Sequence, residues 1–375
     1  METCDVLIVG GGPAGSSCAW RLVTAGLNVV VIDKSTFPRD KVCAGWITPA
    51  VLQDLAIDLD DYRQGRICQP IRAVRTGAMS GPYLHHQYND TVSYGIRRCE
   101  FDDYLLKRSG AKLRLGEPLK KLKRQNHHWI INDNIKAKML VGAGGHFCPV
   151  ARSLGARVGK GEQSVAAQEI EFEMNDLQVS ACTVEADTPE LFFYPDLSGY
   201  AWLFRKGRYL NVGVGRDMGE KISQSALQFL EFCERQGKIP KDLNVKMKGH
   251  AYLLYDYAVR KLFDDNVLLI GDAAGLAYTE SGEGIRPAVE SGLIAAQVIH
   301  DARGNYQQSH LQAYHAHLIQ RFGKRQPQHH GWLPGQLKRT LAKQLLSNRF
   351  LSRHILLNRF FLHKKDPPII LNKVS

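Results

Sequence analysis

A glycine-rich turn between a strand-like run and a helix-like run constrains the fold of this chain more than any other feature. The stretch DVLIVGGGPAG gives the spacing GxGxxG at Gly10, Gly12 and Gly15. In such a turn the first glycine makes the bend, the second lets the backbone approach a pyrophosphate, and the third allows close helix packing. Pro13 and Ala14 complete the turn at the N-terminus of the helix, which attracts phosphate. The motif predicts a dinucleotide-binding βαβ unit.

Two acidic residues extend this prediction. Asp33 closes the next strand-like run, LNVVVID, 18 residues after Gly15, where a carboxylate can accept hydrogen bonds from a ribose hydroxyl. Far along the chain, Gly271 and Asp272 follow the apolar run VLLI in the same way. Two nucleotide-contacting segments so distant in sequence indicate one long, extended ligand, because a nicotinamide cofactor alone would not need the second.

The order of apolar runs predicts an α/β fold with a discontinuous Rossmann-like domain for the cofactor. Continuous apolar runs are typical of parallel strands covered on both faces. Aromatic and β-branched runs between Gly, Pro and Asp favour an antiparallel sheet later in the chain. The predicted division is a cofactor domain at 1–70, 95–161 and 255–301, an inserted, mainly antiparallel β substrate domain at 71–94 and 162–254, and a basic helical C-terminal region at 302–375.

The positive charge is concentrated in that C-terminal region. It holds 13 Lys or Arg and one acid, Asp366, so it carries the whole net charge of +12. Interleaved Leu, Phe, Arg and Lys are typical of an interfacial helix, which favours peripheral contact with a membrane. A solvated cap on the cofactor domain is the alternative. Nucleic acid is not expected as a partner, because no recognised reading module accompanies the charge.

Other residue patterns exclude several classes of protein. We expect a cytoplasmic protein, because no run of about 18 apolar residues is present and the N-terminus lacks a signal peptide's features. The eight cysteines include no CxxC pair and are expected as free thiols. Three histidine pairs lack metal-ligand spacing and are expected on the surface or in loops, so no metal site is predicted: His85 and His86, His127 and His128, and His329 and His330.

Five stretches together resemble the geranylgeranyl reductase family of FAD-dependent oxidoreductases, within the wider glutathione-reductase and hydroxylase fold. They span residues 5–296 and read DVLIVGGGPAG, FPRDKVCAGW, YGIRRCEFDDYLL, YAWLFRKGRYLNVGVG and VLLIGDAAGLAYTESGEGIRPAVESGLIAA. The resemblance implies FAD as the cofactor. It implies that Asp33 binds the adenosine ribose, that Arg98 lies near the phosphate or ribose region, and that Asp272 contacts the ribityl chain or the pyrophosphate.

The resemblance also implies that the turn from Ser281 to Ile285 lies against the isoalloxazine ring. A surface salt bridge of Arg98 with Glu100 or Asp102 is the alternative for that residue. The predicted cofactor-binding residues are Gly10, Gly12, Pro13, Ala14, Gly15, Asp33, Lys34, Lys41, Ala44, Arg98, Gly271, Asp272, Gly282, Gly284 and Ile285.

The chain departs from the family pattern at two places. Family relatives and hydroxylases commonly have GADG where this chain has GAGG, so the acid is missing at Gly144. That acid is associated with pyridine nucleotide handling, so the electron donor is left open between NAD(P)H and another external donor. Thr279 stands where a proline is usual, which predicts a different loop shape on the flavin side.

Cys43 is the predicted catalytic residue. It lies in CAG, which resembles the family's CGG motif near the flavin, with Ala44 as the one change. A thiol there could orient a substrate double bond or donate a proton after hydride transfer, and Lys41 nearby would favour a thiolate. Cysteine is also a small apolar residue, so packing in the turn is the alternative.

Alternate aromatic residues predict a substrate wall. Tyr200, Trp202 and Phe204 share one face of a strand-like run and could line a site for an elongated apolar molecule, with sheet-core packing as the alternative.

Together these features predict an FAD-dependent oxidoreductase that transfers hydride from reduced FAD to a carbon–carbon double bond of a hydrophobic isoprenoid or lipid-like substrate. A monooxygenase acting on a hydrophobic or aromatic substrate is the first alternative, and a flavin-bearing electron carrier or sensor is the second. The expected partners are the substrate, an electron-donor protein and a membrane surface.

Overall fold

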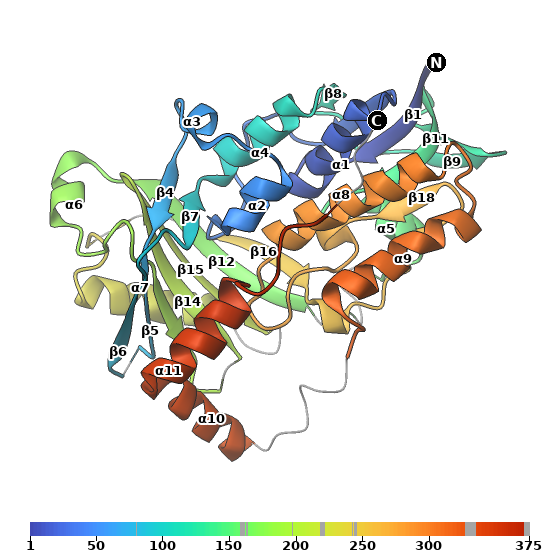
Figure 1. The fold of residues 1–375 in the computed structure, drawn as a ribbon. Coiled ribbons are helices and arrows are strands. Elements are labelled where there is room, and N and C mark those ends of the chain that lie inside the picture. Colours follow the sequence, from blue (N-terminus) through green and yellow to red (C-terminus); the bar gives the residue numbers. More distant parts are fainter. Residues whose placement is uncertain are drawn as a thin grey trace.

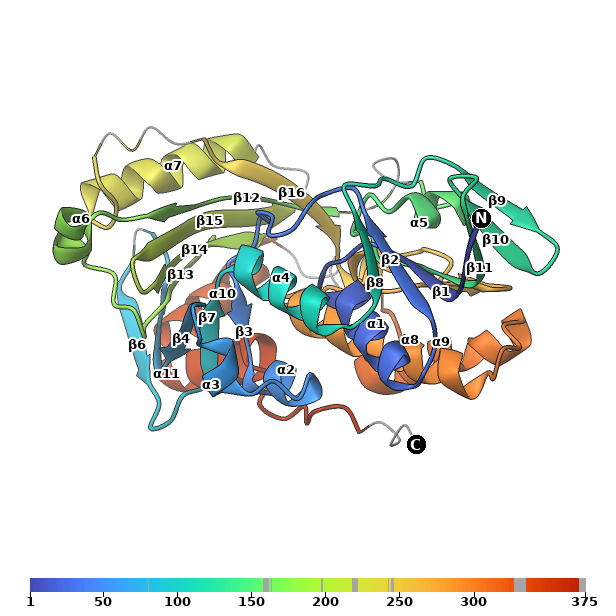
Figure 2. The same cartoon turned by 90° about the horizontal axis from the view of Figure 1, so that it is seen from above.

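The chain forms two lobes, each built on one large β-sheet (Figures 1 and 2). The computed structural model describes residues 1–79, 81–157, 162, 164–196, 198–217, 222–241, 243, 246–326 and 335–370.

The sheet of the first lobe has eight strands and a parallel centre. Its central strands are almost wholly apolar, which suits burial on both faces. The order is β17 (Phe263–Asp264), β18 (Val267–Leu269), β11 (Ile135–Gly142), β1 (Glu2–Val9), β2 (Val29–Asp33) and β8 (Lys112–Leu115), and the hairpin β9 (Leu122–Gln125) and β10 (His128–Ile131) continues antiparallel from β11.

Helices cover both faces of this sheet. One face carries α1 (Pro13–Thr24), α8 (Ile285–Asp301) and α9 (Gln308–Phe322), and the other carries the β9–β10 hairpin and α5 (Pro149–Ser153) (Figure 2). The first two helices touch closely because glycine stands at the contact. A Cβ atom at Gly292 would lie 2.3 Å from the carbonyl oxygen of Ala14. This contact holds the start of α1 against α8.

The second lobe is built on a seven-stranded sheet in which every pair but β5 and β13 is antiparallel. Its strands come from two separate stretches of the chain, 73–87 and 164–253. In spatial order they are β16 (Lys248–Leu253), β12 (Ser164–Glu173), β15 (Tyr209–Asp217), β14 (Gly199–Lys206), β13 (Glu190–Phe193), β5 (Ala73–Gly77) and β6 (Tyr83–Gln87).

Each face of the second sheet is covered by a different part of the chain. Ala201 and Leu203 pack toward α7 (Ile222–Arg235), near α6 (Asp176–Ala181). Trp202 and Phe204 face the opposite way and pack with Leu356 and other residues of the C-terminal region. The helices of that region lie over this face of the sheet (Figure 2). That region comprises α10 (Gly335–Ser347), α11 (Arg349–Leu351) and a π-helical stretch, η3 (Ser352–Phe361).

Smaller elements join the lobes. A three-stranded antiparallel sheet lies beside α4 (Arg98–Arg108), and its order is β3 (Trp46–Ile47), β7 (Ser93–Ile96) and β4 (Cys68–Ile71). The remaining short helices are α2 (Pro49–Asp54), α3 (Leu59–Tyr62), η1 (Tyr255–Tyr257) and η2 (Gly271–Ala273).

The predicted fold class is confirmed, and two finer expectations are wrong. His86 lies fully buried in β6 and is hydrogen-bonded to Thr76 and Ser352, instead of at the surface or in a loop. The C-terminal region is not a solvated cap, because residues 356–362 pack into the core of the second lobe. His329 and His330 lie outside the described residues. Within the described part of the chain, no helix is both long and apolar enough to cross a bilayer.

We expect Gly292→Ala to destabilise the protein by about 1–3 kcal/mol, because the added methyl group overpacks the contact between α1 and α8. Chemical denaturation followed by circular dichroism measures this free energy of unfolding. His300→Ala, on a partly exposed position of the same helix, is the control and should change it by less than about 0.5 kcal/mol. Equal stability of both variants would show that the two helices can separate without cost.

Candidate functional site

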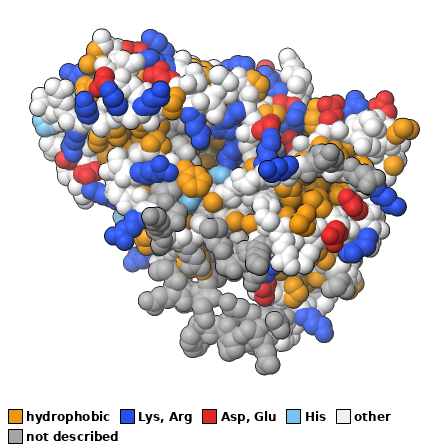
Figure 3. All heavy atoms as spheres, turned by 180° about the vertical axis from the view of Figure 1, so that it is seen from behind, with side chains coloured by type: hydrophobic (Ala, Val, Ile, Leu, Met, Phe, Trp, Pro, Cys, Tyr) orange, Lys and Arg blue, Asp and Glu red, His pale blue; other side chains and the backbone are white. Residues whose placement is uncertain are grey.

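A cavity of about 690 Å³ lies between the two lobes and is lined by residues of both. Its walls include the glycine turn before α1, the end of β2, the Cys43 loop, the turn before α8 and aromatic residues of β14. The space-filling view shows the surface hollowed between the lobes, with Lys and Arg side chains beside the hollow (Figure 3). Most sequence-predicted site residues therefore meet at one place.

The glycine turn presents bare backbone to the cavity. Gly10 has a φ of 116°, and a Cβ there would lie 2.3 Å from the carbonyl oxygen of Ala143. Gly12 caps the N-terminus of α1, and the atom nearest to a Cβ there is Nη2 of Arg39, at 3.5 Å. Pro13 and Ala14 follow in the cavity wall. The first amides of the helix are therefore accessible to an anion.

Gly15 and Gly271 lie behind this turn and shape it. A Cβ at Gly15 would lie 1.9 Å from the carbonyl oxygen of Gly10. Gly271 has a φ of 59°, and a Cβ there would lie 2.9 Å from the Cβ of Ala14. Both residues act by letting backbone segments approach, and neither is part of the cavity wall as described.

Asp33 is held at the end of β2 by the turns on either side of it. One carboxylate oxygen accepts the Gly11 amide at 2.8 Å, and the other accepts the Ser35 amide at 2.9 Å. Since each oxygen has two lone pairs, the carboxylate can still accept from a ligand hydroxyl. Lys34 lies beside it in the cavity wall.

Arg98 combines the two roles that the sequence left open. It makes two 2.7 Å hydrogen bonds to Asp102 and also lines the cavity. The pair is buried, so the expected surface salt bridge is wrong about depth, and Glu100 pairs with Arg97 instead. Arg39 approaches the same Asp102 carboxylate at 3.3 Å. Two guanidinium groups are thus fixed near the glycine turn.

Asp272 faces the cavity from η2, beside His250. Nε2 of His250 lies 3.6 Å from the carboxylate, which is an ion-pair distance rather than a hydrogen bond. Burial alone would raise the pKa of Asp272, but His250, Lys41 and Arg98 together lower it. The carboxylate therefore stays ionised and can accept hydrogen bonds from a polyol or ribose.

Lys41 is a cation of the site whose pKa is strongly lowered. Burial lowers the pKa of its ammonium group to about 8, with Arg98 and Arg39 acting in the same direction and Asp272 opposing them. An anionic ligand beside Lys41 would favour the charged form.

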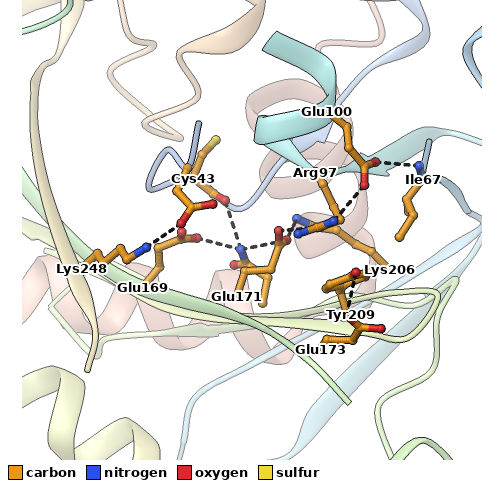
Figure 4. A network of polar contacts seen from close by, with 12 residues as sticks. Cys43, Ile67, Arg97, Glu100, Glu169, Glu171, Glu173, Lys206, Tyr209 and Lys248 are labelled. Carbon is orange, nitrogen blue, oxygen red and sulfur yellow. Dashed lines mark hydrogen bonds and ion pairs between the residues drawn. The ribbon is translucent and has the colours of Figure 1, made fainter. Parts of the chain in front are cut away.

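The loop that carries Cys43 is fastened to the second sheet. Its carbonyl oxygen accepts a hydrogen bond from Nδ2 of Asn211 at 3.2 Å (Figure 4). Its amide favours the charged form of the Glu169 carboxylate. The Cys43 thiol lines the cavity, accepts the Gly45 amide at 3.4 Å and contacts the Arg98 guanidinium. Both readings of Cys43 are therefore compatible with its position.

A partly buried ionic network supports this attachment (Figure 4). Lys206 is fully buried and pairs with Glu171 at 2.7 Å. Arg97 bridges Glu171 to Glu100 on α4, at 3.2 and 2.8 Å. Because the network joins strands of the second sheet to a helix beside the first, it fixes the two walls of the cavity relative to each other.

Aromatic side chains form the far wall. The Tyr200 hydroxyl donates to the carbonyl of Ser281 at 2.7 Å, and the Trp202 indole donates to Asn211 at 2.8 Å. Trp46 and Phe361 line the same wall, with ring centroids 5.6 Å apart. Phe204 lies on the same face of the sheet as Tyr200 and Trp202, but it packs against Trp46 and is not part of the described lining.

The turn before α8 closes the cavity next to Asp272. Gly282 has a φ of 70°, and a Cβ at Gly284 would lie 3.4 Å from Oδ1 of Asp272. Ile285 begins α8 and lines the cavity, as does Ala44 on the Cys43 loop. This bare turn would accept a flat ring against its backbone.

Comparisons with known proteins decide the family. A family model described as FAD dependent oxidoreductase matches residues 5–91. Digeranylgeranylglycerophospholipid reductase 3 of Methanosphaera stadtmanae is 31% identical, over 87% of this chain and 85% of that relative. The chain belongs to the geranylgeranyl reductase family of FAD-dependent oxidoreductases. A menaquinone reductase of Mycobacterium tuberculosis is 27% identical, over 80% and 77%.

Solved structures agree on the fold of this family member. A geranylgeranyl bacteriochlorophyll reductase-like protein from Thermoplasma acidophilum has a TM-score of 0.77 at 22% identity, covering 97% of this chain and 98% of its own. The halogenase PltM in complex with FAD has a TM-score of 0.68 at 16% identity, covering 85% and 74%.

The residues around the cavity of this FAD-dependent oxidoreductase fit its cofactor. Open amides at the start of α1 and the cations Arg39 and Lys41 suit a pyrophosphate. Carboxylates at two separate places, Asp33 and Asp272, suit the two polyol parts of an extended dinucleotide. The bare turn before α8 leaves room for a ring.

Sequence reasoning missed several residues of the site. Asn211 carried a usable signal, since a polar side chain inside an apolar strand needs a buried partner. His250, Tyr252 and Phe361 carried none, because only the tertiary fold brings their elements to the cavity. No cluster of metal-ligating side chains occurs among the residues that the structure describes.

We expect FAD to bind the apoprotein more weakly as the pH rises through about 8. Anionic FAD prefers the ammonium form of Lys41, whose pKa burial lowers to about 8. Above that pH, binding must take up a proton, so Kd rises by up to about tenfold per pH unit. Fluorescence titration from pH 7 to pH 9.5 measures this.

Lys41→Met should bind FAD more weakly at pH 7 and lose the pH dependence. Lys261→Met, at an exposed lysine outside the described lining, should match the wild type. A wild-type Kd that stays constant across the range would rule out the phosphate contact.

Proposed function

We propose that this FAD-dependent oxidoreductase reduces carbon–carbon double bonds of a hydrophobic isoprenoid or lipid-like substrate. The observation that carries the proposal is the aromatic wall of Tyr200, Trp202, Trp46 and Phe361, which continues the same cavity that suits FAD. Relatives named as digeranylgeranylglycerophospholipid reductases and menaquinone reductase support it. An enclosed apolar wall has no use in a simple electron carrier or sensor.

In this proposal FAD extends from Asp33 to the turn before α8. The glycine turn with Pro13 and Ala14 binds the pyrophosphate, together with Lys41 and Arg98, while Lys34 and Ala44 flank the cofactor. Asp272 binds the ribityl region, and the backbone of Gly282, Gly284 and Ile285 lies against the ring. When bound in its reduced form, the flavin supplies hydride.

The protein's own side chains then position the substrate. Trp202 is fixed by Asn211, and Gly213 opposite it has no side chain, so the indole can lie flat against β15. The same Asn211 holds the Cys43 loop. We propose that Cys43 contacts the substrate double bond and orients it. The electron donor, which must reach the oxidised cofactor to reduce it, is either NAD(P)H or a donor protein.

An anaerobic single turnover tests the proposal. The flavin is reduced with dithionite, a geranylgeranyl lipid is added, and flavin absorbance and product mass are followed. We expect reoxidation with saturation of a double bond. Reoxidation only after oxygen is admitted, with a hydroxylated product, would instead identify a monooxygenase.

Cys43→Ala should lower the rate of that turnover by about tenfold or more, because loss of orientation at the reacting carbon is costly. FAD content should be unchanged. Cys99→Ala, a half-buried thiol outside the described lining, is the matched control. Equal rates for Cys43→Ala and wild type would leave Cys43 with a packing role.

We also propose that the C-terminal helices rest on an anionic membrane. Phe350 is 67% exposed and Leu341 44% exposed, and Lys343 and Arg349 stand beside them. Basic residues near an anionic surface contribute about 1 kcal/mol each. Such contact would bring the aromatic wall close to a lipid substrate.

Sedimentation with phosphatidylglycerol vesicles tests this contact. We expect binding that weakens with salt and falls by about tenfold in Leu341→Ser/Phe350→Ser, since both side chains lose insertion into the interface. Leu177→Ser, which alters an 83% exposed leucine on α6, should bind like the wild type. Absence of wild-type sedimentation would refute membrane contact.

A further inference from the structure

Two buried polar atoms, one on a residue of the cavity wall and one on a residue behind it, face each other without hydrogen-bond partners. Oε2 of Glu283 and Nε2 of His363 lie 3.9 Å apart, and within the described part of the chain neither makes a hydrogen bond. Glu283 belongs to the turn before α8 and lines the cavity. His363 follows Phe361 of the aromatic wall by two residues. Unpaired buried groups of this kind are costly, so they call for a functional explanation.

We propose that Glu283 is the catalytic acid that protonates the substrate, and that His363 is the positioning residue that resupplies its proton. This inference rests on the proposed function, because saturating a double bond requires a proton at the second carbon. The proposal assigns a function in proton transfer to each of the two unpaired atoms.

Glu283 is placed between the predicted cofactor and substrate regions. Its Oε1 accepts the amide of Arg286 at 3.2 Å, which fixes the carboxyl group and leaves Oε2 free. Two residues earlier, the carbonyl oxygen of Ser281 accepts a hydrogen bond from the hydroxyl of Tyr200 in the aromatic wall. On the other side, Gly284 stands next to Asp272. A carboxyl group here can reach a carbon that lies between the ring and the wall.

Burial keeps a substantial fraction of Glu283 in its acid form near neutral pH. Burial raises its pKa to about 7, while His363 and Arg286 oppose that rise and Glu290 adds to it. The Arg286 charge is largely engaged by Glu290, at 2.7 Å. Tyr278 of the same turn and Tyr200 of β14 also face the carboxyl group, and burial raises the pKa of both phenols, so they remain neutral.

His363 connects this buried carboxyl group to solvent. Its ring stacks on Tyr278, with centroids 3.9 Å apart and planes 26° apart. Its Nδ1 lies 3.1 Å from Oδ2 of Asp366, whose side chain is 48% exposed. The residue has a φ of 46°, a conformation that side-chain-bearing residues rarely adopt. The turn it makes aims the other nitrogen at Glu283.

The step balances in atoms and charge. Two electrons reach one alkene carbon as the hydride of the proposed function, the O–H bond of Glu283 breaks, and its proton forms the C–H bond at the other carbon. Glu283 is then a carboxylate, which takes a proton from the His363 imidazolium. His363 recovers that proton from water beside Asp366.

Anaerobic single turnovers between pH 6 and pH 8.5 test Glu283. In the wild type, the rate should fall as the pH rises through about 7, because the acid form is lost. Glu283→Gln should be slower by about 100-fold or more and independent of pH, since it has no proton to give. Glu280→Gln removes an exposed carboxylate from the same turn and should follow the wild-type profile. A wild-type profile in Glu283→Gln overturns the assignment.

His363→Gln separates the two roles. Its first turnover at pH 6 should match the wild type, because Glu283 starts protonated, while repeated turnover should slow. An equal rate of repeated turnover in His363→Gln and wild type would show that His363 does not resupply the proton.

Infrared titration of the protein without substrate provides a readout independent of activity. Burial also raises the pKa of Glu169 to about 7, so the decisive signal is the protonated carboxyl band that depends on Glu283. This band should be lost with a midpoint near pH 7 in wild type and Glu280→Gln, on top of the Glu169 signal, and Glu283→Gln should show the Glu169 signal alone. Absence of this band in the wild type overturns the inference even if the enzyme is active. A wild type that shows the band but reduces no double bond would instead refute the proposed function.

Discussion

The hydrogen bond from Asn211 to the carbonyl oxygen of Cys43 is the contact on which the cavity depends. One wall of the cavity belongs to a parallel sheet and the other to an antiparallel sheet, and neither sheet shares a strand with the other. Their separation is set where Asn211, Glu169 and the Lys206–Glu171–Arg97 network meet the loop. Because Asn211, Glu169 and Lys206 are buried, each must keep its partner, which makes the spacing of the walls rigid.

Rigid spacing has a chemical benefit. An alkene that is saturated in one step needs a donor on one side and an acid within reach of the adjacent carbon. A 1 Å error in such a geometry can cost about 100-fold in rate. A contact between lobes that is made of ion pairs fixes the distance between the cavity walls better than an apolar contact, whose side chains can repack with little loss of stability.

Much of the fold could be predicted from the sequence, because its signals are local. The GxGxxG turn, Asp33 and the alternation of Tyr200 and Trp202 each depend on neighbours a few residues away. The burial of individual side chains could not be predicted. The i to i+4 spacing of Arg98 and Asp102 indicates an ion pair but not that the pair is buried. The contributions of the C-terminal region could not be predicted either. The local sequence around Phe361, FFLH, gives no sign that this side chain reaches a cavity built from much earlier parts of the chain.

The late position of Phe361 and His363 affects the order of assembly during synthesis. Both large sheets and the turns that suit FAD are complete by Asp301, so the ribosome has made the whole cofactor cradle before it makes the last piece of the aromatic wall. A nascent chain can therefore form its nucleotide site while the apolar side is still open. The C-terminal segment can then close that side after the cofactor has entered.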